Sequence, residues 1–245
     1  DGEMSLNTFR PVALIPAYNH YQVIDELLDA LEALDLPVIL VDDGSNDLCA
    51  RSLDVSAASH RKASLVRLAK NGGKGAAIAG LYVADNMNFT HAIQIDADGQ
   101  HGLAAVTDFL DQARHNPQAL VCGYPVYDQT VPLARLWGRE LTNFWVHVNT
   151  RSKALKDAMC GFRVYPIAQT LPVLPSVRTR RMDFDPDIAV RLLWAGVPVI
   201  NRPVRVTYPK DGISHFRGFS DNMRISRLHA GHFCTMLLRR MGLAK

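Results

Sequence analysis

Two aspartates separated by one residue open the segment Asp96-Ala97-Asp98-Gly99-Gln100-His101. The apolar run 92–95 before them predicts a strand, so both carboxylates are expected at its carboxyl end, where they can converge on one side of the chain. Carboxylate oxygens are preferred ligands of Mg²⁺ and Mn²⁺, and these ions commonly bridge such groups to substrate phosphates. We therefore predict a divalent-metal site at Asp96, Asp98 and Gln100, with Asp98 at the catalytic centre. A solvated turn after a strand would show the same pattern.

Two further loops carry residues suited to a nucleotide. Asp42-Asp43-Gly44-Ser45 follows the apolar run 38–41, and a carboxylate in this position can accept hydrogen bonds from a base or a ribose. Asn71-Gly72-Gly73-Lys74-Gly75 precedes a helix predicted for 75–86. It lacks the GxxxxGK[ST] spacing of a P-loop. A glycine-rich turn, a lysine and a helix N-terminus nevertheless suit an anionic diphosphate.

The elements that must position these loops alternate regularly in the first half of the chain. Strands are predicted at 12–15, 38–41, 65–68, 92–95 and 119–122, and helices at 20–34 and 75–86. This alternation predicts an α/β fold with a mostly parallel sheet flanked by helices, and ligands bind such sheets beyond the carboxyl ends of the strands.

After residue 124 the pattern changes. A long helix is predicted at 133–150, a compact element at 160–165, a helix at about 187–195, a strand-like stretch at 197–208 and an amphipathic helix at about 221–240. We expect one domain over 1–245, with a nucleotide-binding half at 10–123, a second half at 124–217 and a basic tail at 218–245.

Composition and charge restrict the class of protein. The net charge of +3 is uneven, because 201–245 carry nine Lys and Arg against two Asp and Glu, which leaves 18 against 22 for the rest. Such a tail indicates an anionic surface or ligand, or else a solvated helix face. The four cysteines form no CxxC pair. No helix-turn-helix pattern or basic stretch with interleaved aromatics indicates nucleic-acid binding, and GxGxxG is absent after the first strand, which argues against a dehydrogenase.

Five ordered segments together resemble the family-2 glycosyltransferases, most closely the dolichyl- and polyprenyl-phosphate sugar synthase branch. They are Ile15-Pro16-Ala17-Tyr18-Asn19, Val41 to Asp47, Asn71 to Ala77, Asp96 to His101, and Asp157-Ala158-Met159-Cys160-Gly161-Phe162-Arg163-Val164-Tyr165. The resemblance spans residues 11 to about 200.

The resemblance implies a GT-A fold and inverting transfer of a sugar from a UDP- or GDP-sugar, with Mg²⁺ or Mn²⁺ stabilising the departing diphosphate. It implies that Pro16, Ala17, Tyr18 and Asn19 line the nucleoside pocket, that Asp43 contacts the base or ribose, and that Lys74 lies beside the nucleotide. Asp96, Ala97, Asp98 and Gln100 are expected around the metal and diphosphate, and Arg163 at the acceptor or diphosphate. The residues 10–123 then form the nucleotide-sugar-binding half and 124–217 the acceptor side.

The acceptor is less well defined by the sequence. A hydroxyl acceptor needs a general base, whereas a phosphate acceptor is already an anion. The candidates for this base are Asp157, Asp183, Asp185 and Asp187. Pro186-Asp187 also fits a helix start, and Asp185 fits its N-cap. The stretch 208–217 reads as a loop that closes over the phosphates with His215 and Arg217 as donors, or as an ordinary surface loop.

The basic final helix, 221–245, suits an anionic membrane surface, or it packs on its own domain. No apolar run is long enough to cross a bilayer. We therefore expect a cytoplasmic protein that meets a lipid-linked or membrane-associated acceptor peripherally, on the cytoplasmic face of the membrane. Two alternatives stay open: a transferase with a soluble saccharide or hydroxyl acceptor, and a nucleotide-sugar-binding protein without transfer activity.

Overall fold

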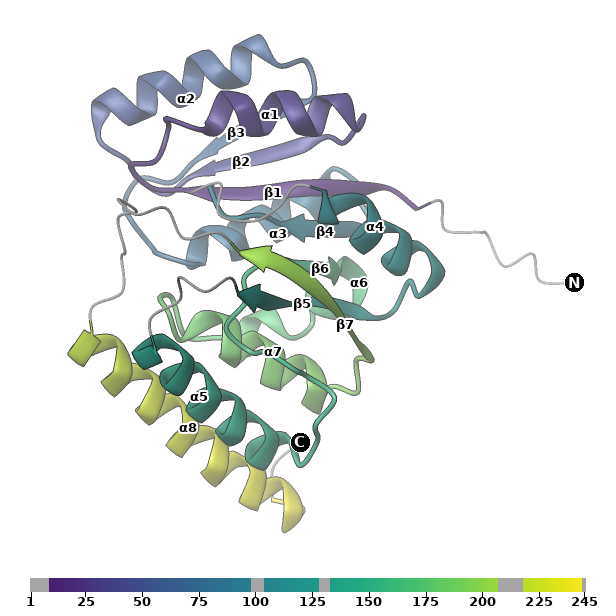
Figure 1. Ribbon diagram of the computed structural model, residues 1–245, viewed down its shortest axis with the longest axis vertical. Helices are drawn as coiled ribbons and strands as arrows, with labels where there is room; N and C mark the ends of the chain where they lie inside the picture. The colour runs from purple at the N-terminus through teal and green to yellow at the C-terminus, as the bar shows by residue number, and fades with distance from the viewer. Residues whose placement is uncertain (1–8, 98–103, 128–132, 207–217, 244–245) are drawn as a thin grey trace, which may run out of the picture.

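A mixed seven-stranded sheet forms the centre of the molecule, and helices cover both of its faces (Figure 1). The computed structural model describes residues 9–97, 104–127, 133–206 and 218–243. The strands are β1 (Pro11–Ala17), β2 (Val38–Asp42), β3 (Ala63–Arg67), β4 (His91–Gln94), β5 (Leu120–Tyr127), β6 (Arg163–Pro166) and β7 (Val199–Val206). The helices are α1 (Ile24–Ala33), α2 (Asp47–Ser59), α3 (Gly75–Asn86), α4 (Ala105–His115), α5 (Leu133–Thr150), α6 (Ile167–Thr170), a 3₁₀ turn η1 (Leu174–Ser176), α7 (Phe184–Trp194) and α8 (Gly218–Arg240).

The order of the strands brings the polar loops to one edge of the sheet. The order is β3-β2-β1-β4-β6-β5-β7. Strands β3, β2, β1 and β4 pair in parallel, so the carboxyl ends of β1, β2 and β4 meet at the same edge. The loops that begin at Tyr18, Asp43 and Ile95 are therefore neighbours in space although up to about 80 residues separate them in sequence.

Alternating side chains of the inner strands fill two separate cores. On β1, Val12 and Leu14 pack with α3 and α7 on one face of the sheet. Ala13 and Ile15 pack with α1, α2 and α4 on the other face. A strand buried on both faces needs apolar residues at every position, and this explains the continuous apolar runs in the sequence.

The predicted α/β fold with a mostly parallel sheet is confirmed, with one difference in topology. The element expected at 160–165 contains β6, which inserts between β4 and β5 and runs antiparallel to both. Its four residues are all buried. The antiparallel direction matters for the site because it places the residues that precede β6, including Gly161, beside the end of β4.

Helices α5 and α8 lie side by side and contact α7 through an unexpected face (Figure 1). The sequence predicts that Trp137, Leu141 and Phe144 belong to the apolar side of α5, yet these residues are 78%, 60% and 57% exposed. The buried residues of α5 are Thr142, Asn143, Val146 and Asn149.

The packed stripe of α8 is likewise mostly polar. It consists of Asp221, Ile225, His229 and His232, which recur every three or four residues and are all buried. Phe233 and Leu237, which the sequence assigns to the apolar side of α8, are 37% and 39% exposed. Of the two alternatives for the final helix, packing on its own domain is therefore observed. The predicted apolar residue Ile225 is buried, but the rest of the packed stripe is polar, and other apolar side chains of both helices face outward. Among the described residues no helix is long and apolar enough to cross a membrane.

Candidate functional site

The loops after β1 and β2 are joined by reciprocal hydrogen bonds. The backbone N–H of Asn19 donates to Ser45 Oγ (3.0 Å), and the N–H of Asn46 donates to Asn19 Oδ1 (2.9 Å). Asn46 also caps α2, since its Oδ1 accepts from the N–H of Cys49. Asn19 therefore has a structural role in this corner, where its φ is +52°. Tyr18 is 39% exposed beside it. Pro16 and Ala17 are the last two residues of β1.

Asp42 and Asp43 are both buried, but they perform different tasks. Asp42 accepts from Arg67 Nε at 2.7 Å and from the N–H of Ser45 at 2.9 Å, so it ties β2 to β3 and to its own loop. Asp43 accepts from the N–H of Gly72 (2.7 Å) and from Asn71 Nδ2 (3.1 Å). Burial raises the pKa of Asp43, and the N–H donors only partly offset this. Asp43 thus fixes the glycine-rich loop against β2.

The glycine-rich loop is held from its other side by the segment before α7. The N–H of Lys74 donates to the carbonyl of Arg180. Gly73 has φ of +66°, and a Cβ there would lie 2.1 Å from that carbonyl oxygen. Only glycine satisfies both conditions. The loop is consequently fixed at the N-terminus of α3, where no side chain caps the first N–H groups.

Three charged side chains from distant parts of the chain converge beside this loop. Lys74 Nζ lies 3.1 Å from Asp96 Oδ1 and 3.3 Å from Asp185 Oδ2. Asp96 follows β4, and Asp185 lies in the first turn of α7. We call Lys74, Asp96 and Asp185 the carboxylate–lysine cluster. Burial alone would lower the pKa of Lys74, but the charges of Asp185 and Asp96 outweigh it and raise that pKa.

Gly161 and Gln94 surround this cluster. A Cβ at position 161 would lie 3.1 Å from Asp96 Oδ2 and 3.2 Å from both Lys74 Nζ and Gln94 Nε2. The backbone therefore approaches the charged groups as closely as a glycine permits. Neither amide atom of the buried Gln94 side chain, nor Asp185 Oδ1, has a hydrogen-bond partner among the described residues. Buried polar atoms of this kind are costly unless a ligand, an ion or water meets them.

Of the four predicted base candidates, Asp157, Asp183, Asp185 and Asp187, only Asp185 belongs to the cluster. The carboxylate of Asp187 is saturated: Oδ2 accepts from Thr179, and Oδ1 contacts Arg191 Nε (2.6 Å) and His232 Nε2 (2.9 Å). Burial would raise the pKa of Asp187, but His232, Arg191 and Thr179 outweigh it and lower that pKa. Asp187 thus joins α7 to α8.

Asp157 closes a turn and pairs with α5. Its Oδ1 accepts from the N–H groups of Met159 and Cys160 and from Arg139 at 2.7 Å. The side chain is 4% exposed. A catalytic role for Asp157 or Asp187 remains a prediction, but the contacts of both explain their presence structurally.

Arg163 is fully buried, and its contacts are with backbone. Its two terminal nitrogens donate to the carbonyls of Asp185 (2.8 Å) and Ala158 (2.6 Å). The predicted contact with acceptor or diphosphate stays a prediction, since the observed geometry instead connects β6 to the start of α7.

Sequence reasoning missed Gln94 and Arg180 as parts of this region, and it did not predict that Arg139 pairs with Asp157. A polar residue inside the apolar run 92–95 was the available signal for Gln94. Nothing in the local sequence connects Arg180 with Lys74, because their contact depends on the fold. The predicted site residues Asp98, Gln100, His215 and Arg217 lie outside the described residues.

The chemistry of the cluster fits a divalent ion together with a diphosphate. Asp96 supplies a carboxylate that is 28% exposed, and Mg²⁺ is commonly held by one or two carboxylates plus substrate phosphates. The lysine ammonium between two carboxylates shows that this place stabilises positive charge. Within the described ranges, no three His, Cys, Asp or Glu side chains are grouped to hold a metal, so the diphosphate or undescribed residues such as Asp98 would complete the ligand set.

Comparison with known proteins identifies the class. The model of the family "Glycosyl transferase family 2" matches residues 12–166, well over half of the chain. The chain belongs to this family, and it is a glycosyltransferase.

Named relatives narrow the branch. The chain is 24% identical over 236 residues to a dolichyl-phosphate beta-glucosyltransferase of Dictyostelium discoideum, covering 87% of this chain and 71% of that protein. It is 26% identical over 225 residues to an undecaprenyl-phosphate mannosyltransferase of Micrococcus luteus, covering 85% and 88%. Both relatives agree with the polyprenyl-phosphate sugar synthase branch.

Solved structures confirm the GT-A fold. Glucosyl-3-phosphoglycerate synthase from Mycobacterium tuberculosis, solved with Mn²⁺, UDP and phosphoglyceric acid, superposes with a TM-score of 0.67 at 14% identity, over 97% of this chain and 80% of that one. Mannosyl-3-phosphoglycerate synthase from Rubrobacter xylanophilus gives 0.66 at 17%, over 96% and 75%. At these identities the likeness concerns the fold.

The conformation of the glycine-rich loop can be tested by substitution. Gly73→Ala should lower the melting temperature more than twice as much as Gly196→Ala. Both positions have positive φ, but nothing lies within 4 Å of a Cβ at 196. The control thus measures the φ penalty of about 1 kcal/mol alone, and Gly73→Ala adds the clash with the Arg180 carbonyl. Equal shifts in thermal unfolding would show that the loop is not held as described.

Proposed function

We propose that this glycosyltransferase moves a sugar from a UDP- or GDP-sugar to the phosphate of a polyprenyl-phosphate acceptor, with inversion at the anomeric carbon. The observation that carries the proposal is the convergence of Asp96, Lys74 and Asp185 at the edge where β1, β2 and β4 end. Membership of family 2 supports sugar transfer, the names of the two relatives support the acceptor class, and the UDP in the solved glucosyl-3-phosphoglycerate synthase supports a nucleoside-diphosphate donor.

The nucleoside is assigned to the corner formed by the loops after β1 and β2. Tyr18 offers an exposed ring there, and Asp43 and Asn19 hold the surrounding backbone. The diphosphate would lie between this corner and the cluster, near the N-terminus of α3 and the Lys74 ammonium. The first N–H groups of α3 donate to backbone carbonyls, so the groups that favour phosphate oxygens here are the Lys74 ammonium and the positive end of the helix dipole.

The acceptor chemistry follows from its charge. A phosphate oxygen is already anionic at neutral pH, so it can attack the anomeric carbon without a general base while the bond to the diphosphate breaks. A bound Mg²⁺ or Mn²⁺ would supply charge stabilisation for the leaving group. Lys74 orients the diphosphate, Asp96 would hold the metal ion, and Asp185 lies 3.3 Å from the Lys74 ammonium before the ligand enters. If the acceptor is instead a hydroxyl, Asp185 is the best-placed described carboxylate to accept its proton.

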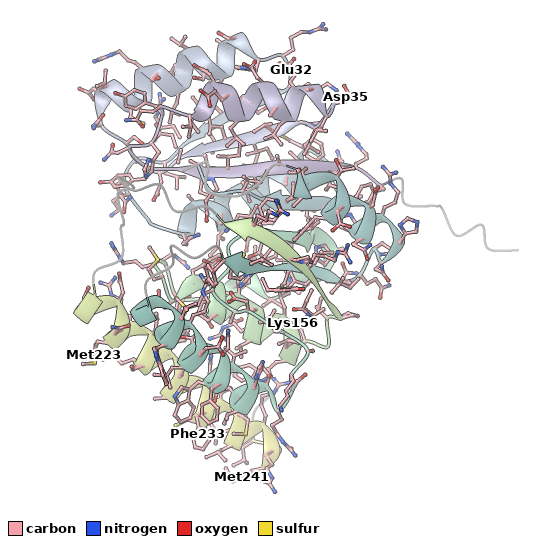
Figure 2. The ribbon with its side chains drawn as sticks, in the orientation of Figure 1. Glu32, Asp35, Lys156, Met223, Phe233 and Met241 are labelled. Carbon is pink, nitrogen blue, oxygen red and sulfur yellow. The ribbon has the colours of Figure 1, made fainter. Side chains whose placement is uncertain are left out.

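Membrane contact is assigned to the outward faces of α5 and α8. Trp137, Leu141 and Phe144 of α5 are more than half exposed. Met223, Phe233 and Met241 project from the outer edge of α8 and its end (Figure 2), and are 40%, 37% and 61% exposed. We call these six residues the apolar rim. Tryptophan and basic residues beside exposed apolar side chains are typical of helices that lie at a membrane interface. The basic residues Arg224, Arg227 and Arg240 belong to α8.

The transferase proposal predicts both a donor and a key residue. Incubation of the protein with Mn²⁺, labelled UDP-glucose or GDP-mannose, and a polyprenyl phosphate should yield labelled lipid with one of the donors. Asp96→Asn should lower the rate by about 100-fold or more, since a metal-site carboxylate is lost. Asp25→Asn, on the exposed side of α1, is the matched control and should transfer normally.

The assay also separates the alternatives. Transfer only to a soluble sugar or phosphorylated acid would contradict the lipid acceptor and keep the transferase. Nucleotide binding without transfer to any acceptor would favour a binding protein. Unchanged transfer by Asp96→Asn would contradict the assignment of the cluster.

The membrane proposal predicts binding to anionic vesicles through the rim. The affinity for phosphatidylglycerol-containing vesicles, measured by sedimentation, should fall about tenfold or more in the double variant Trp137→Ser, Phe144→Ser. A tenfold loss corresponds to about 1.4 kcal/mol, and the burial of two aromatic side chains contributes more than this. The control Leu48→Ser, Val55→Ser changes two residues that are 59% and 66% exposed on α2 and should sediment like the wild type. Equal sedimentation of all three proteins would contradict a role for the rim.

A further inference from the structure

The Lys74 ammonium occupies an unusual position for a residue expected to meet a diphosphate. It lies within 3.3 Å of two carboxylates that come from different layers of the fold, one after β4 and one at the start of α7. The Lys74, Asp96 and Asp185 side chains are only 20%, 28% and 6% exposed. Water therefore screens their interactions weakly, and the lysine stabilises a pair of charges that would otherwise repel each other.

The backbone of Lys74 is held by hydrogen bonds, whereas its ammonium is held only by ion pairs. The N–H of Lys74 donates to the carbonyl of Arg180, and the N–H of Gly72 donates to the carboxylate of Asp43. These bonds hold the loop in place. A lysine carries its charge on a flexible four-carbon stem and has no fixed donor geometry. The ammonium can therefore exchange one anionic partner for another without a change in the loop.

The charges of the cluster decide which ligands it accepts. One lysine and two aspartates give a local charge of −1. A divalent ion alone would change this to +1 and would lie against the lysine ammonium. A divalent ion together with a diphosphate that carries two charges leaves the total at −1, and it offers the lysine a new anionic partner.

We propose that Lys74 is an internal counter-ion for the metal position: it neutralises Asp96 and Asp185 in the absence of ligand, and it moves to the diphosphate when the metal–nucleotide complex enters. This inference rests on the proposed function and adds an order of binding to it. Metal alone binds weakly because it must displace the lysine into a site without another anion. Metal and nucleotide bind together, and each raises the affinity of the other by the same factor.

A structural ion pair is the competing explanation. In that case Lys74 only ties α7 to the end of β4, and its removal would weaken metal binding or leave it unchanged. The counter-ion role predicts the opposite sign, because removal of the lysine takes a competing positive charge away from Asp96 and Asp185. The direction of the change in metal affinity therefore distinguishes the two roles.

The experiment is a titration with Mn²⁺, in which electron paramagnetic resonance measures the free ion with and without UDP. In the wild type, UDP should lower the Kd for Mn²⁺ about tenfold or more. Without UDP, Lys74→Met should bind Mn²⁺ about tenfold more tightly than the wild type, and the effect of UDP on Mn²⁺ affinity should shrink. Lys70→Met removes the same charge from an exposed position earlier in the same loop and should behave like the wild type.

If circular dichroism shows that Lys74→Met does not fold, Lys74→Gln takes its place. The same gain in Mn²⁺ affinity is expected for that variant. Mn²⁺ affinity without UDP that is unchanged or weaker in the folded Lys74 variant would overturn the inference. If the wild type still transfers sugar in that case, the proposed function stands. If no protein binds Mn²⁺ even with UDP, both the metal assignment and the counter-ion role are wrong. An equal gain in Lys70→Met would also overturn the inference, because overall charge would then explain the effect.

Discussion

The buried guanidinium of Arg163 fixes the relation between the sheet and α7, on which the geometry of the site depends. A charged group without solvent exposure is tolerated only when its donors are satisfied and opposite charges are near. The carbonyls of Asp185 and Ala158 accept from its two terminal nitrogens, while its Nε has no partner among the described residues. These carbonyls belong to the two segments that flank the carboxylate–lysine cluster. Because β6 also pairs with β4, the same residue keeps Asp185 at a set distance from the strand that delivers Asp96. The cluster is thus a consequence of a buried charge as well as of its own ion pairs.

Parallel strands explain why so much of the site was predictable from the sequence. Apolar runs buried on both faces are local patterns, and the polar residues that follow them must meet at one edge. The strands at 12–15, 38–41, 65–68 and 92–95 were therefore located correctly, as were the helix at 75–86 and the proximity of Asp43, Lys74 and Asp96 to that edge. The motif order identified the family for the same reason, because each motif is a strand end with its loop.

Features that depend on tertiary contacts were not accessible in this way. The antiparallel direction of β6 cannot be read from four buried residues. Asp185 and Asp187 are both base candidates in the sequence, yet Asp185 lies beside Lys74 and Asp187 is saturated by Arg191, His232 and Thr179. The sequence predicts an apolar side for both α5 and α8 without showing what covers it, and the structure buries mostly polar stripes and exposes aromatic residues. Periodicity shows that a helix has an apolar side, and it does not show whether protein or another apolar phase covers that side.

The central claim is that the cluster holds the diphosphate of a sugar nucleotide together with a divalent ion. The most direct measurement is the anomalous difference density of Mn²⁺ in crystals grown with Mn²⁺ and the nucleoside diphosphate that the protein binds. The account predicts one strong peak within about 2.5 Å of an Asp96 carboxylate oxygen, with the diphosphate between it and the N-terminus of α3 and with the Lys74 ammonium turned toward a phosphate oxygen. A Mn²⁺ peak and nucleotide away from this edge of the sheet would contradict the account.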